Sequence, residues 1–184
     1  MGLSRPAPRP GLFRRLRGDR RGVSAVEFAM LAPVIISLYF GLAEVCQGFM
    51  AQKRAGHAAA MVGDLVAQRD VITSDEIDDA FEIGDLIMKP FPSTTLNIRV
   101  SSVTRGNDDV NRVDWSRGSG MPARAVGTTV ILPAGVVERG QSVVFAESTY
   151  DYDSPVDYLM PTITRYSHSF YLRPRLVDRI SYSD

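Results

Sequence analysis

Glu27 is the residue whose type and position in this sequence most clearly indicate a chemical role. It is the only charged residue between Val23 and Ala43, a run of 21 residues that would extend about 31 Å as a helix. Such a run is long enough to cross a bilayer, and a carboxylate inside a bilayer is costly. We therefore expect Glu27 to act in processing or assembly. In the alternative reading, it only stabilises the positive end of the helix dipole.

The residues before this run are strongly basic. Residues 1–22 contain seven arginines and one acid, Asp19, so they carry a net charge of +6, and residues 23–184 carry −6 because the whole chain is neutral. Cationic flanks of a membrane helix stay in the cytoplasm. The leader is thus expected inside and the remainder outside, with the arginines contacting anionic lipid and no nucleic acid as a partner.

Gly22 lies before the apolar run, so cleavage after it would leave the hydrophobic helix on the mature protein, unlike cleavage of a secretory signal. Counting from Val23, Glu27 is the fifth residue and Phe28 the sixth, an arrangement that resembles the signal of type IV prepilins. The matching residues are Gly22, Ser24 to Ala29 and Leu31 to Val34. With this motif, the chain resembles the TadE-like pseudopilin family of the tight-adherence (Flp, type IVc) pilus system.

This resemblance implies a minor pilin or pseudopilin that is cleaved after Gly22 by an aspartic prepilin peptidase, with Glu27 and Phe28 used in recognition and assembly. It implies a place in the bacterial inner membrane, with a periplasmic head, and work in initiating, priming or stabilising the pilus that mediates surface adhesion. The implied partners are the prepilin peptidase, a sister pseudopilin, the major Flp pilin, the inner-membrane platform of the Tad machinery and membrane lipid. No cofactor is implied.

Cleavage would create an α-amino group at Val23, which is mostly protonated near neutral pH because its ordinary pKa is about 7.7 to 8. Glu27 of one subunit could pair with this amine in a neighbour, which would neutralise two charges in apolar surroundings. Pro33 removes the hydrogen bond to the Ala29 carbonyl and predicts a helix kink. Either a helix softened for leaving the membrane or a kink of no consequence fits this position.

The rest of the chain predicts an α+β, pilin-like fold in three parts: the leader at 1–22, a long helix at 23–68 that is first transmembrane and then periplasmic, and a periplasmic head at 69–184. The outer half of the helix presents one apolar face to the head. It also carries a stripe of small residues, suited to close helix contacts or simply scattered in an alanine-rich helix. The face comprises Ala58, Val62, Leu65 and Val66, and the stripe comprises Gly41, Gly48, Ala55, Gly56, Ala59 and Gly63.

A second, short helix is predicted after residue 73. Thr73 and Glu76 have the spacing of a capping box, and Lys89 with Pro90 closes the helix. Apolar side chains at Ile77, Ala80, Phe81, Ile87 and Met88 are expected to face the core. The acids at Asp75, Glu76, Asp78, Asp79, Glu82 and Asp85 are expected to form a solvated face instead of a metal site, since they lack the spacing of a calcium loop.

Alternating apolar residues predict an antiparallel sheet of about four strands, at 96–101, 113–116, 141–153 and 165–173, packed on the helices. The Asn-Asp-Asp sequence at 107–109 predicts a turn between the first two strands. Residues 126–132 fit either a short strand or an extended loop crossing the sheet.

No catalytic or metal-binding pattern is present in the sequence. His57 and His168 have no metal-ligand spacing, and the pairs Asp108/Asp109 and Asp151/Asp153 are read as turn residues. Cys46 is expected to be buried in a helix interface, with an intermolecular disulfide as the alternative. We therefore expect a protein that is not an enzyme. The rival readings are an uncleaved, membrane-anchored periplasmic binding or signalling module and a tethered hydrolase that uses acids and tyrosines of the sheet.

Overall fold

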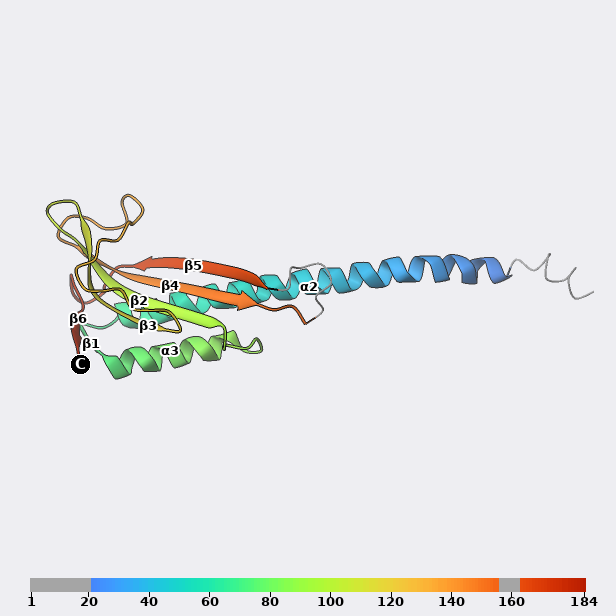
Figure 1. Cartoon of the computed structure of the whole chain (residues 1–184), viewed down its shortest axis with the longest axis horizontal. Helices are drawn as coiled ribbons and strands as arrows, with labels where there is room; N and C mark the ends of the chain where they lie inside the picture. Colours follow the sequence, from blue (N-terminus) through green and yellow to red (C-terminus); the bar gives the residue numbers. More distant parts are fainter. Residues whose placement is uncertain (1–20, 156–162) are drawn as a thin grey trace, which may run out of the picture. The chain divides into compact units, whose positions relative to one another are not determined.

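The computed structural model describes residues 21–155 and 163–184, and Figure 1 shows it coloured along the sequence. The chain divides between Leu42 and Ala43 into two compact units, of which the second is the head. The fold is α+β, as predicted. Its helices are α2 (Arg21–Ala67) and α3 (Ser74–Met88), and its strands are β1 (Val71–Thr73), β2 (Leu96–Arg105), β3 (Asn111–Ser119), β4 (Ser142–Tyr152), β5 (Thr164–Leu172) and β6 (Ser181–Ser183).

The outer half of α2 packs on the sheet through small residues. Ala58, Val62 and Val66 are fully buried, as the apolar face predicted. A Cβ atom added at Gly63 would lie 2.8 Å from the Leu172 side chain, and one added at Gly56 would lie 3.2 Å from the His168 ring. The outer part of the small-residue stripe therefore lets the sheet of the same chain approach α2 closely, which is a role within the head.

Helix α3 begins with the predicted capping box. The Thr73 hydroxyl accepts a hydrogen bond from the Glu76 N–H at 3.3 Å, and the Glu76 carboxylate accepts one from the Thr73 N–H at 3.1 Å. These two bonds satisfy backbone and side-chain groups at the start of the helix. Lys89 is the C-cap residue, and the apolar side of α3 is buried at Ile77, Ala80, Phe81 and Met88.

The sheet is antiparallel with the strand order β3-β2-β4-β5, and both helices cover the same face of it (Figure 1). Gly63 of α2 contacts Ala146 and Leu172 on β4 and β5, whereas Gly84 of α3 contacts Ile98 on β2. The main core lies between these layers. It includes Ala58, Val62, Val66, Ile77, Phe81, Met88, Ile98, Val100, Trp115, Val144, Ala146, Tyr150 and Tyr152.

Residues 127–130 run antiparallel along the outer edge of β3, so of the two predictions for residues 126–132 the short strand is the nearer one. The N–H of Val113 donates to the Thr128 carbonyl at 3.0 Å, and the Gly127 N–H donates to the Val113 carbonyl at 2.8 Å. The segment forms one isolated bridge, between Arg112 and Thr129, and its Val130 belongs to a second apolar cluster. This cluster contains Val103, Val113, Val130, Val137, Val143 and Phe145.

Residues near the C-terminus hold together the end of the head where α2 passes into α3. Strand β6 pairs in parallel with β1, and the buried Ile180 precedes it. The Trp115 indole N–H donates to the Ile180 carbonyl at 2.9 Å, and the Trp115 ring stacks on Tyr182. Neither β1 nor β6 was predicted from the sequence.

Candidate functional site

The four residues of the predicted processing motif lie in the first two turns of α2. Gly22 has open space around it, since an added Cβ would meet nothing within 4 Å. Val23 is 53% exposed, Phe28 is 70% exposed, and Glu27 is also exposed. The motif is therefore presented on the surface of the helix, where another protein can reach it.

The segment that follows exposes apolar side chains in all directions around the helix. One helix in the described part of the chain is long and apolar enough to cross a membrane, and none of the residues in its most apolar stretch is buried inside the chain. Exposed side chains of this kind include Val26, Met30, Leu31, Val34, Ile35, Ile36, Leu38, Tyr39, Phe40 and Leu42. An apolar solvent satisfies such a surface, so the segment fits a membrane anchor.

Helix geometry places Val23 and Glu27 on the same face, because they are four residues apart. Side chains in a helix point toward its N-terminus, so the Glu27 carboxylate extends toward the peptide bond between Gly22 and Val23. An amine created at Val23 would thus lie near the Glu27 carboxylate of its own chain. The sequence predicted only a pair with the Glu27 of a neighbouring subunit.

Pro33 lies inside α2, and the helix continues through it without interruption. The loss of one hydrogen bond, to the Ala29 carbonyl, therefore does not end the helix. The kink at Pro33 remains a prediction.

Glu44 is a buried carboxylate that was not predicted from the sequence. It is 1% exposed, on the part of α2 that belongs to the head. Burial raises the pKa of Tyr152, and the charge of Glu44 raises it further. The burial of Glu44 could have been predicted from its spacing to Ala51, Ala55 and Ala58. These buried residues lie on the same side of α2 as Glu44.

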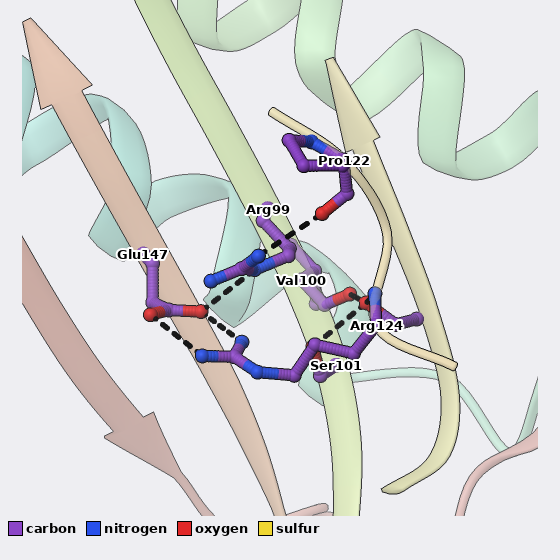
Figure 2. Close-up of polar contacts among 7 residues, drawn as sticks. Arg99, Val100, Ser101, Pro122, Arg124 and Glu147 are labelled. Atoms are coloured by element: carbon purple, nitrogen blue, oxygen red, sulfur yellow. Dashed lines mark hydrogen bonds and ion pairs between the residues drawn. The ribbon is translucent and has the colours of Figure 1, made fainter. Parts of the chain in front are cut away.

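A cluster of charged side chains lies on the sheet face opposite the helices, where Glu147 of β4 holds two arginines (Figure 2). Arg99 Nε donates to Glu147 Oε2 at 2.9 Å, and Arg124 Nη2 donates to Oε1 at 3.0 Å. Arg124 Nη1 also donates to Oε2. Arg99 Nη1 donates to the Pro122 carbonyl at 3.0 Å, so the cluster fixes the start of the loop that follows β3 to the sheet.

This cluster is suited to holding the loop and not to proton transfer. Both Glu147 oxygens accept hydrogen bonds from guanidinium groups. Burial alone would raise the pKa of Glu147, but the hydrogen bonds and charges of Arg124 and Arg99 outweigh it and keep the pKa below its usual value. The Arg124 guanidinium also lies 4.9 Å from the centre of the Phe145 ring.

Three of the other acids singled out in the sequence, Asp108, Asp109 and Asp151, are held by arginines. Bidentate hydrogen bonds join Arg112 to Asp108, Arg139 to Asp109 and Arg165 to Asp151. Arg112 lowers the pKa of Asp108 to about 2. Within residues 21–155 and 163–184, no three His, Cys, Asp or Glu side chains are grouped closely enough to hold a metal ion.

The two histidines and the cysteine lie apart from one another. His57 is exposed on α2, and the His168 ring packs over Gly56 and stacks with Phe170 at 6.3 Å. Cys46 is exposed. The expected burial of Cys46 is wrong within this chain, because the sheet covers the opposite side of α2.

Comparison with known proteins identifies the N-terminal segment. Residues 22–64 match the family model described as TadE-like protein. No curated protein and no solved structure matches the chain. The match begins at Gly22, the predicted cleavage residue, and it includes the apolar run that could span a membrane. From Gly22 to Asp64 the chain is therefore similar to the TadE-like family, the family that its motif resembles.

Proposed function

We propose that this chain is the precursor of a minor pilin or pseudopilin, cleaved after Gly22 by a prepilin peptidase, that initiates, primes or stabilises the Flp pilus. One observation carries the proposal: α2 is a single helix with two kinds of surface. Its first half exposes apolar side chains all round, and its second half buries one face in the head. Such a helix can serve first as a membrane anchor and then as an assembly element.

The start of α2 suits cleavage. Glycine within a helix costs about 1 kcal/mol relative to alanine, so the first turn at Gly22 unwinds more readily than the turns that follow. The open space around Gly22 leaves room for a peptidase. The mature protein would keep the apolar segment and lose the arginine-rich leader that holds the N-terminus in the cytoplasm.

Assembly would then use Glu27. A carboxylate in the apolar part of the helix is expensive unless it is paired, and the new amine at Val23 supplies the opposite charge. Pairing between subunits would make assembly depend on prior cleavage. The partners would be a sister pseudopilin, the major Flp pilin and the inner-membrane platform of the Tad machinery.

A role other than catalysis is part of this proposal. The acids Asp108, Asp109 and Asp151 are engaged by arginines, and Glu147 is held by two. In the hydrolase reading, at least one such carboxylate would have to be available for proton transfer.

N-terminal sequencing tests the cleavage step. Protein recovered from cells with the prepilin peptidase should begin at Val23, and protein from cells without it should retain the leader. Gly22→Val should block cleavage, whereas the neighbouring Ser24→Ala should not. A retained leader in all samples would refute the proposal and favour an uncleaved membrane-anchored binding or signalling module.

Glu27→Ala and Glu27→Gln test the assembly step. Both variants should insert into the membrane and fail to support pili, since neither can pair with an amine. If the variants are cleaved normally, the carboxylate acts on a neighbouring subunit, and if they stay uncleaved, it acts on the peptidase. Normal pili with either variant would refute the role of Glu27.

A further inference from the structure

The outer side of α3 is a ridge of acids that ends in an apolar residue. Asp75, Asp79, Glu82 and Leu86 follow one another at helical spacing on the side of α3 away from the core, and all four are exposed. Within the described residues, Asp75, Asp79 and Glu82 form no ion pair, and Leu86 is 58% exposed. This acidic ridge (Asp75, Asp79, Glu82 and Leu86) has the charge and the apolar contact needed to bind a basic helix.

The same chain carries a surface of the opposite kind on α2. Phe49, Lys53 and His57 are exposed at successive intervals of four residues, on the side away from the sheet, and Cys46 lies one turn before them. Phe49 is 57% exposed, and the Lys53 ammonium lies 5.3 Å from the centre of its ring. Lys53 forms no ion pair with any described residue. We call Phe49, Lys53 and His57 the basic strip.

The two surfaces match in spacing as well as in charge. When α2 of one copy lies antiparallel to α3 of another, Phe49 lies opposite Leu86, Lys53 opposite Glu82, and His57 opposite Asp79. Residues three or four apart on a helix lie on one face, so all three pairs can form at once between antiparallel helices. On both sides an apolar residue is followed by a charged residue and then by a further polar one.

We propose that the basic strip of one copy of this chain binds the acidic ridge of a second copy. The partner is identified by charge complementarity, since the ridge needs a cationic helix with an apolar residue one turn away and this chain supplies one. The contact joins two different surfaces, so a pair of copies keeps one free ridge and one free strip, and the contact can repeat.

The fold also gives the displacement between successive copies. Gly84 of α3 lies beside Ala58 and Val62 of α2, so Leu86 is level with about residue 58 of its own α2. Phe49 lies about nine residues earlier, and bringing Leu86 of the second copy to that level shifts the copies by roughly 13 Å along α2. This staggered contact rests on the proposed function. It identifies the surfaces through which copies of the head assemble.

Site-specific cross-linking in membranes tests the contact. Two full-length copies with different tags are produced together: one keeps Cys46, and the other carries Cys46→Ser and Leu86→Cys. A short bismaleimide should join the two tags. Lys53→Glu in the first copy should lower the yield about tenfold, because it places like charges opposite each other. Adding Glu82→Lys in the second copy should restore the yield to within about twofold.

Glu138→Lys in the second copy is the matched control, because Glu138 is exposed elsewhere on the head. It should leave the yield with an unaltered first copy unchanged and should not rescue Lys53→Glu. No cross-link between folded copies, or a yield that ignores Lys53→Glu, would overturn the contact. Both surfaces lie within residues 43–184 and exist in the precursor, so the assay also works without the peptidase. A cross-linked but never cleaved protein would refute only the cleavage, and a cleaved protein without the cross-link would refute only the contact.

Discussion

Replacing Glu147 with glutamine should destabilise the head, because it leaves two guanidinium groups without their shared carboxylate (Figure 2). The side chains of Glu147 and Arg99 are each 16% exposed, and that of Arg124 is 20% exposed. The cost should fall between that of an exposed pair, up to about 1 kcal/mol, and that of breaking a buried pair, about 3 to 5 kcal/mol. We expect the free energy of unfolding to fall by about 2 kcal/mol.

The single tryptophan, Trp115, gives a direct assay of this change. Its side chain is buried in the head, so its fluorescence reports unfolding of the head in detergent-solubilised full-length protein. For a chain of this size, 2 kcal/mol corresponds to a decrease in Tm of about 4 to 8 °C. The control is Asp108→Asn, which removes an exposed bidentate partner of Arg112. Its effect should be smaller and should disappear at high salt.

The contribution of Glu147 to the stability of the head should also depend on pH. Arg124 and Arg99 hold the pKa of Glu147 below its usual value in the folded state. As the pH falls, the unfolded state therefore takes up the proton first, and stability is lost as the pH approaches the folded pKa. The difference in Tm between wild type and Glu147→Gln should be complete at pH 7 and shrink below about pH 4. An equal Tm at pH 7, or a difference that persists undiminished to about pH 3, would refute this reasoning.

Three further substitutions test the packing of the head. Gly63→Ala should destabilise the head by about 1 kcal/mol, because overpacking against Leu172 outweighs the gain in helix propensity. The Tm from the fluorescence melt should fall accordingly, and an unchanged or higher Tm would contradict this. Thr73→Ala should lower stability by about 1 kcal/mol and speed amide exchange in the first turn of α3; unchanged exchange there would argue against the cap. Trp115→Phe should remove the hydrogen bond to the Ile180 carbonyl and speed exchange in β6 without affecting β5, as mass spectrometry of exchanged peptides can check.

The elements that the sequence predicted well are those set by local patterns. The capping box at Thr73 and Glu76 placed the start of α3, and Lys89 placed its end. Alternation at Leu96, Ile98 and Val100 predicted β2, because a strand with one buried face has a period of two. These signals lie within a few residues of the structure they determine.

The elements that the sequence missed depend on partners far away in the chain. Strands β1 and β6 have three residues each and pair across more than a hundred residues, so neither carries a usable alternation of its own. The partners of Glu147 are separated from it by 48 and 23 residues. The exposure of Cys46 depends on which side of α2 the sheet covers, and local composition around Cys46 does not specify that side.

The two kinds of surface on α2 explain why the family match extends beyond the apolar run. The run ends at Ala43, yet the match continues to residue 64. A membrane anchor alone requires only hydrophobic length, which residues 23–43 already provide. The additional residues include Ala51, Ala55 and Ala58, which are fully buried, and Gly63, whose position against Ala146 admits no larger side chain without a shift. The matched segment thus covers both the anchor and the small-residue face on which the sheet of the head packs.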